Sequence, residues 1–105
     1  MELSVLVVPD CPHADLLEQR LAVVLAGRPD ATITRRVIAD AEQAQRWSMP
    51  GSPTLLIDGV DPFAKSGQPA SLSCRLYPNG IGKSEGAPAV SALRAAIEDA
   101  SDGRS

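Results

Sequence analysis

Cys11 and His13 are the side chains of this chain best suited to nucleophilic chemistry, and they lie two residues apart in the stretch VVPDCPHADLL. This stretch joins an apolar run to a helical pattern. If the helix starts at Pro12, Cys11 becomes its N-cap, where unpaired backbone N–H groups and the helix dipole favour the thiolate. The thiolate is the nucleophilic form of cysteine, and a protonated His13 would favour it further. We therefore predict that Cys11 and His13 are catalytic.

Each of these side chains also has a purely structural interpretation. Cys11 would then fill a gap as a small apolar residue, and His13 would be an exposed residue of the first helical turn. Asp10 directly precedes the cysteine. We expect it to form the turn, and its alternative role is that of a proton donor. The sequence predicts no metal site and no cofactor.

The second cysteine, Cys74, lies in the alternating run SLSCRLY. The alternation places it on one face of a strand with Leu72 and Leu76, so we predict that it is buried as a small apolar side chain. In the expected sheet it lies roughly 10 Å from Cys11, too far for a disulfide without movement. Its alternative role is that of a second thiol. No partner can be assigned to Asp61 or Arg75, which are taken as turn, solvent or packing residues.

Composition and charge exclude several classes of protein. The chain has 105 residues, 44% of them hydrophobic and 22% charged, which is typical of a single globular domain. The net charge is −3, which argues against a nucleic-acid partner. No apolar stretch reaches the ~20 residues that cross a bilayer, and the start of the chain lacks the features of a signal peptide. We expect a cytoplasmic protein whose cysteines are thiols and not a structural disulfide.

Hydrophobic periodicity and turn residues predict seven elements. A short apolar run predicts a buried strand, a spacing of i, i+4, i+7 predicts a helix, and strict alternation predicts an edge strand. Asp40 and Gln43 form a capping box at the start of the second helix. In chain order the predicted elements are strand 3–8, helix 12–25, strand 31–39, helix 40–47, strand 52–57, strand 71–77 and helix 90–100.

The order of these elements predicts an α/β fold. The first two strands would be parallel, joined by a right-handed helical crossover. The third and fourth strands would be antiparallel, because the loop between them is too short for a helical crossover. The expected architecture is thioredoxin-like: a four-stranded mixed sheet in the order 2-1-3-4 with helices on both faces. Residues 1–101 would form one domain, and residues 102–105 a frayed tail.

Two motifs carry a resemblance to the thioredoxin-like superfamily over nearly all of the chain. One is Cys11 after the first strand, and the other is GSPT before the third strand. The resemblance implies that Pro53 follows a cis peptide bond and faces the cysteine. It also implies that an extended substrate pairs with the backbone of Ser52 like an added strand. The implied substrate-binding residues are Pro12, Ser52, Pro53 and Thr54.

The segment CPH resembles the Cys-Pro-His-Cys motif of DsbA-type disulfide oxidants, but position 14 is alanine, so the resolving thiol of that motif is missing. The segment SPTLLIDGVDPFA, together with the later segment SCRLY, also makes the chain similar to small actinobacterial proteins catalogued as thioredoxin-like or as alkylmercury lyase-like.

Three functions follow as hypotheses. The first is a single-cysteine disulfide oxidoreductase, in which Cys11 attacks a disulfide-bearing protein or small molecule and an external low-molecular-weight thiol releases the adduct. The second is organomercurial cleavage or mercuric-ion handling by Cys11 with Cys74, or with an acid such as Asp10. The third is a non-enzymatic module that binds a partner through the surface around Cys11 and Pro53.

Overall fold

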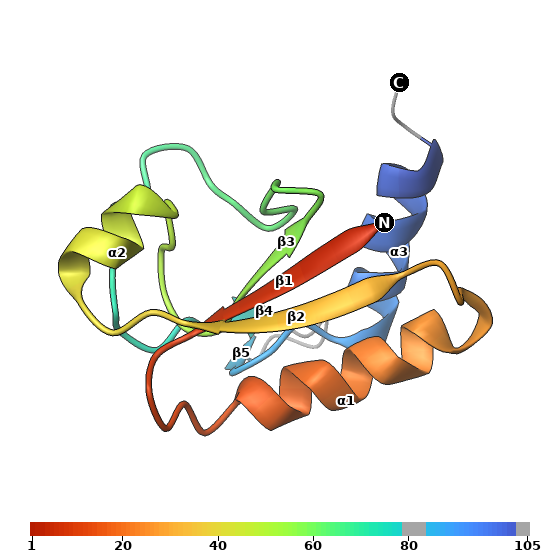
Figure 1. The fold of residues 1–105 in the computed structure, drawn as a ribbon, viewed down its shortest axis with the longest axis horizontal. Coiled ribbons are helices and arrows are strands. Elements are labelled where there is room, and N and C mark those ends of the chain that lie inside the picture. Colours follow the sequence, from red (N-terminus) through yellow and green to blue (C-terminus); the bar gives the residue numbers. More distant parts are fainter. Residues whose placement is uncertain (79–83, 103–105) are drawn as a thin grey trace.

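A three-stranded mixed sheet organises the fold of the computed structural model, which describes residues 1–78 and 84–102 (Figure 1). The strand order is β2-β1-β3. This order and the parallel pairing of β1 with β2 are as predicted for the first three strands, and β1 pairs antiparallel with β3. The central strand β1 is buried on both faces, since Leu3 and Val5 lie in one core and Leu6 in the other. The strand bounds are Glu2–Val7 for β1, Thr32–Val37 for β2 and Thr54–Ile57 for β3.

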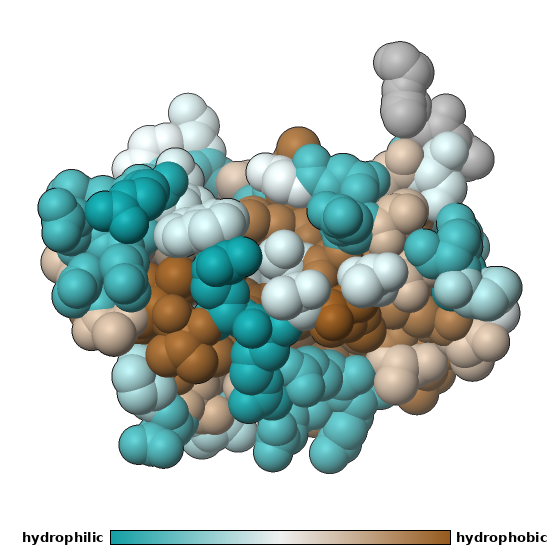
Figure 2. Space-filling model, viewed as in Figure 1, coloured by the Kyte–Doolittle hydropathy of each residue, from teal (hydrophilic) through white to brown (hydrophobic). Residues whose placement is uncertain are grey.

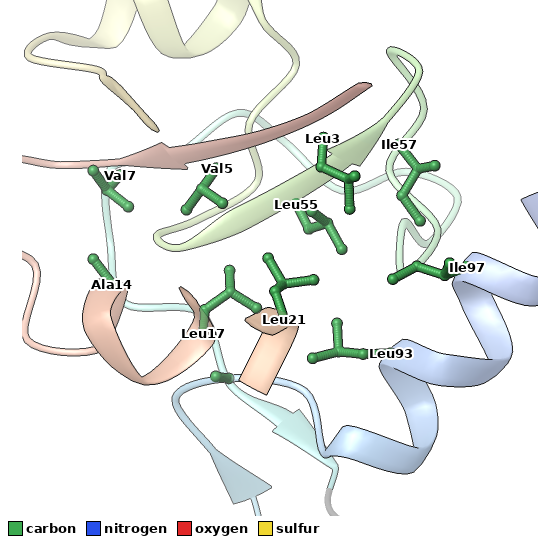
Figure 3. Packing of buried hydrophobic residues seen from close by; sticks show 11 residues of the cluster. Leu3, Val5, Val7, Ala14, Leu17, Leu21, Leu55, Ile57, Leu93 and Ile97 are labelled. Carbon is green, nitrogen blue, oxygen red and sulfur yellow. The ribbon is translucent and has the colours of Figure 1, made fainter. Parts of the chain in front are cut away.

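Two helices cover one face of the sheet, as Figures 1 and 3 show. They are α1 (Ala14–Val24), which continues into the short 3-10 helix η1 (Leu25–Gly27), and α3 (Val90–Asp102). The predicted helical spacing is confirmed, since the residues that repeat at i and i+4 are the buried ones. Together with the strands they form the main core: Leu3, Val5, Val7, Ala14, Leu17, Leu21, Leu55, Ile57, Ala87, Leu93 and Ile97.

The short helix α2 (Ala41–Arg46) covers part of the opposite face. The predicted capping box is confirmed. The Asp40 carboxylate accepts the Gln43 N–H at 2.9 Å, and the Gln43 side chain accepts the Ala39 N–H at 2.8 Å. Such a cap contributes ~1 kcal/mol to helix stability. Helices therefore lie on both faces, and the second core comprises Leu6, Ile38, Ala44, Met49 and Leu56.

The β2 edge of the sheet faces solvent and is seen from the front in Figure 2, where hydrophilic and hydrophobic side chains lie next to each other. Ile33 and Val37 are exposed. Between them, Arg35 forms ion pairs with Asp15 at 2.8 Å and Glu18 at 2.6 Å. Charged side chains on an edge strand oppose pairing with another chain. This edge is thus shielded by charge and not by a further strand.

The expected antiparallel fourth strand is not present among the described residues. Cys74 pairs with Ser52 through one isolated β-bridge, and this bridge is parallel. β4 (Tyr77–Pro78) then pairs with β5 (Ser84–Glu85) in a separate antiparallel ribbon. The prediction failed because the long segment after β3 folds back across the end of the sheet, and so returns parallel without a helical crossover.

Burial along residues 74–77 is the reverse of the predicted alternation, whereas Leu72 is half-buried and Ser73 exposed as predicted. Arg75 and Tyr77 are buried, whereas Cys74 and Leu76 are exposed. The prediction that Cys74 is buried is therefore wrong. The physical reason is that buried polar groups are tolerated where they are hydrogen-bonded, and both Arg75 and Tyr77 find such partners.

The described residues contain no helix long and apolar enough to cross a membrane. The Cα radius of gyration is 13.0 Å, the value expected for one compact domain of this length. The predicted tail falls mostly on residues 103–105, which lie outside the described residues.

Candidate functional site

Cys11 lies in a tight turn between β1 and α1. Asp10 has a φ of +60°, the Cys11 N–H donates to the Val8 carbonyl at 3.2 Å, and the Cys11 carbonyl accepts the Ala14 N–H at 3.4 Å. The helix begins only at Ala14, with His13 as its N-cap. The prediction that Cys11 is the N-cap is therefore wrong, because the turn made by Asp10 delays the helix by two residues. Asp10 itself is exposed and has the predicted role of a turn former.

The Cys11 sulfur has a specific hydrogen-bond partner in Ser52. The Ser52 hydroxyl donates to Cys11 Sγ at 3.1 Å and accepts the Val8 N–H at 3.0 Å. Ser52 is 1% exposed, whereas Cys11 is half-buried and so remains within reach of solvent. Because the Val8 N–H occupies a lone pair of the hydroxyl oxygen, the hydroxyl proton is directed at the sulfur. A donor held in this way stabilises negative charge on the sulfur.

The Ser52–Pro53 peptide bond is cis, as the resemblance implies. Pro53 is buried, and its carbonyl accepts the Tyr77 hydroxyl at 2.6 Å. The cis bond is therefore confirmed, and Ser52, the residue before Pro53, lies beside Cys11. Pro12, on the other side of the cysteine, is exposed and free to contact a substrate.

The backbone of Ser52 is already occupied by the chain itself. Its N–H donates to the Ser73 carbonyl and its carbonyl accepts the Arg75 N–H, both at 2.9 Å. An extended substrate cannot pair with the same groups, so the predicted strand addition at Ser52 is wrong. Thr54 is also unavailable, because its fully buried hydroxyl donates to the Gly51 carbonyl at 2.6 Å and accepts from Arg75 at 3.1 Å.

His13 is held by packing against the backbone of Gly86. A Cβ added at Gly86 would meet the imidazole ring at 2.2 Å, so only glycine leaves room for the ring. His13 Nδ1 is buried and has no hydrogen-bond partner among the residues that the structure describes. His13 is therefore not joined to Cys11 through this nitrogen, although it caps the helix that follows the cysteine.

A buried polar network, which the sequence analysis did not predict, surrounds Arg75. Its guanidinium pairs with the Asp61 carboxylate at 2.8 Å and donates to the Phe63 carbonyl at 2.8 Å. It also lies over the Tyr77 ring at 4.7 Å, and the Phe63 and Tyr77 rings meet edge to face at 5.6 Å. Burial raises the pKa of Tyr77 well above its ordinary value, so its hydroxyl stays protonated and donates to Pro53.

We call Arg75, Asp61, Thr54, Phe63 and Tyr77 the Arg75 network. Its hydrogen bonds to Pro53 and Thr54 hold the segment that carries Ser52 in place. One signal in the sequence pointed to it: an arginine and a tyrosine share a face in the alternating run SLSCRLY. Their partners, 14 and 24 residues away, are set by the tertiary fold.

Cys74 lies next to Ser52, joined to it through the isolated parallel bridge. Its predicted distance from Cys11 rested on the lateral order of the strands, so the parallel direction of the bridge does not change it. Both cysteines are free thiols, and both flank Ser52 near the C-terminal end of β1. Within residues 1–78 and 84–102, no group of three or more metal-ligating side chains is found.

No protein-family model, curated protein or solved structure matches this chain.

Proposed function

We propose that this chain is a thioredoxin-like thiol–disulfide oxidoreductase with Cys11 as its nucleophile. The observation that carries the proposal is the 3.1 Å hydrogen bond from the buried Ser52 hydroxyl to the accessible Cys11 sulfur. A structural cysteine does not need a buried donor aimed at its sulfur. The α/β architecture with β1 at the centre and Ser52–Pro53 beside the cysteine is compatible with this assignment.

The proposed reaction begins with the Cys11 thiolate, which attacks one sulfur of a disulfide. A new S–S bond forms to Cys11, the original S–S bond breaks, and the departing thiolate takes a proton from solvent. Ser52 holds the attacking sulfur in place and stabilises its charge through the hydroxyl proton. An external low-molecular-weight thiol then returns Cys11 to the reduced state.

The substrate class follows from which backbone and side-chain groups near the Cys11 sulfur are free to contact another molecule. Because residues 73–75 occupy the Ser52 backbone, the site offers no strand edge to a peptide. Exposed Pro12 and half-buried Cys11 leave room for a compact group. The proposed substrates are therefore low-molecular-weight disulfides and disulfides displayed at a protein surface, and not extended peptide segments.

The experiment is a single-turnover reaction with an aromatic disulfide, 5,5′-dithiobis(2-nitrobenzoate), followed by release of the coloured thiolate. The wild type should give a fast phase from Cys11 followed by a slower one. Cys11→Ser should lose the fast phase, and Cys74→Ser, the matched control, should keep it. A fast phase that survives in Cys11→Ser, or a wild type no faster than the urea-unfolded chain, would contradict the proposal.

A second candidate function is the handling of mercuric or organomercurial compounds. The observation that favours it is the placement of two free cysteines next to the same residue, Ser52. Thiolates are the ligands that soft metal ions prefer. In carbon–mercury cleavage the organic group would leave with a proton, for which exposed Asp10 is the proposed donor. Incubation with phenylmercuric acetate tests this candidate, because cleavage releases benzene and simple binding does not.

A further inference from the structure

We propose that Cys74 is the resolving thiol of this site and forms a disulfide with Cys11 during the reaction. The inference rests on the proposed function and adds a second reacting residue to it. The motif position that would supply such a thiol holds Ala14, which is 2% exposed and packed in the main core. A thiol from another segment is therefore needed if the adduct is to be resolved within the protein.

The first step of the argument is the distance between backbones. Ser52 donates its N–H to Ser73 and accepts the N–H of Arg75, the pattern of a parallel bridge centred on Cys74. Chains bonded in this way lie about 4.8 Å apart. Cys74 is thus one strand spacing from Ser52, whose side chain contacts the Cys11 sulfur.

The second step is the direction of the side chains. A Cβ built on Gly51 would lie 2.8 Å from Arg75 Cβ, so positions 51 and 75 face the same side of the bridge. Side chains alternate along extended segments, so Ser52 and Cys74 share the other side. The Ser52 side chain points at Cys11. The Cys74 side chain therefore projects to the side of Ser52 that carries Cys11.

The third step is access. Cys74 is exposed, so no packed group has to move before it can react. A disulfide requires Cα atoms roughly 4.4 to 6.8 Å apart. Cys11 lies in a turn, and residues 73–75 contact the sheet through a single bridge and not a full ladder. Because two hydrogen bonds to Ser52 hold residues 73–75, the movement that closes the disulfide falls on the turn that carries Cys11 and on the Cys74 side chain.

The proposed sequence of bond changes is balanced. The Cys11 thiolate attacks a disulfide RSSR, and one RS⁻ leaves. The Cys74 thiolate then attacks the Cys11 sulfur of the mixed disulfide, so that the Cys11–Cys74 bond forms and the second RS⁻ leaves. Two electrons pass from the two cysteines to the substrate, and the two thiol protons end on the two released thiols. Two equivalents of an external thiol restore the reduced protein.

The experiment is incubation with oxidised glutathione, followed by intact mass measurement and peptide mapping of the wild type, Cys74→Ser and Cys11→Ser. The wild type should lose two hydrogens through a Cys11–Cys74 disulfide and carry no stable adduct. Cys74→Ser should accumulate one glutathione on Cys11. A thermal melt of each variant shows that it is folded, and Cys74→Ala repeats the test if the serine variant is not.

The failures of the two proposals are distinguishable. If the wild type accumulates the Cys11 adduct as fully as Cys74→Ser does, the resolving role of Cys74 is overturned and Cys11 stands as the nucleophile. If the wild type carries the glutathione on Cys74, the resolving role is also overturned. If Cys74→Ser forms no adduct on Cys11, the proposed function itself fails.

Discussion

The main core and the Arg75 network bury side chains by different means. In the core between α1, α3 and the sheet, burial follows apolar periodicity, as in Leu17 and Leu21 one turn apart. In the Arg75 network, Arg75 and Tyr77 are buried, whereas the apolar Leu76 between them is exposed. Partners distant in the sequence satisfy the buried polar groups. Hydrophobic burial is thus specified locally, whereas polar burial is specified by the finished fold.

The largest expected effect comes from breaking the buried ion pair. Arg75→Met removes the guanidinium and leaves the Asp61 carboxylate, 10% exposed in its side chain, without its charge partner. Removing one member of a buried pair costs about 3–5 kcal/mol of unfolding free energy. Urea denaturation measures the loss. The double variant Arg75→Met with Asp61→Leu should recover a large part of it, and no recovery would mean that the pair is not the source of the effect.

Arg75→Met should also slow the reaction of Cys11, because the Arg75 network supports the segment that holds Ser52. The comparison is with a core variant of similar stability. If Cys11 reacts at the wild-type rate in folded Arg75→Met, the network stabilises the fold without positioning the site.

The core variant for this comparison is Leu21→Ala. Leu21 is fully buried between α1 and the sheet, and a leucine-to-alanine change in such a site costs ~2–5 kcal/mol. Under conditions where the variant is folded, the reactivity of Cys11 should be unchanged. The Leu21 side chain lies in the main core, and the change leaves the hydrogen bond between Ser52 and Cys11 intact. A loss of reactivity equal to that of Arg75→Met would remove the distinction between the two regions.

A smaller effect is expected from Tyr77→Phe, which removes the hydroxyl bonded to Pro53. One such bond contributes about 0.5–1.5 kcal/mol. The pKa of Tyr77 is raised on folding, so the folded state keeps a proton that the unfolded state releases near pH 10. The wild type should therefore lose stability as the pH rises above about 10, and the variant should lose less. Equal alkaline loss in both proteins would contradict this assignment.

Much of the fold could be predicted because its signals are local. The spacing of Leu17 and Leu21 gives α1, and the Asp40–Gln43 pair gives the start of α2. The resemblance correctly implied the cis bond before Pro53 and the position of Ser52 beside Cys11. Three features of the molecule were beyond local patterns: the start of α1 at Ala14 instead of Pro12, the parallel bridge at Cys74 and the partners of Arg75. Each depends on where a distant segment or a single left-handed residue places the backbone.

The central claim, that Ser52 supports Cys11 as a nucleophile, is tested most directly by the alkylation rate of Cys11. Iodoacetamide at neutral pH, with peptide mapping over time, gives separate rates for Cys11 and Cys74. Ser52→Ala should slow Cys11 by about tenfold, because the hydroxyl that stabilises its thiolate is lost, an effect worth about 1.4 kcal/mol. Ser4→Ala, a half-buried serine of β1, is the matched control and should leave the rate unchanged. A Cys11 that reacts equally fast in wild type and folded Ser52→Ala would contradict the account.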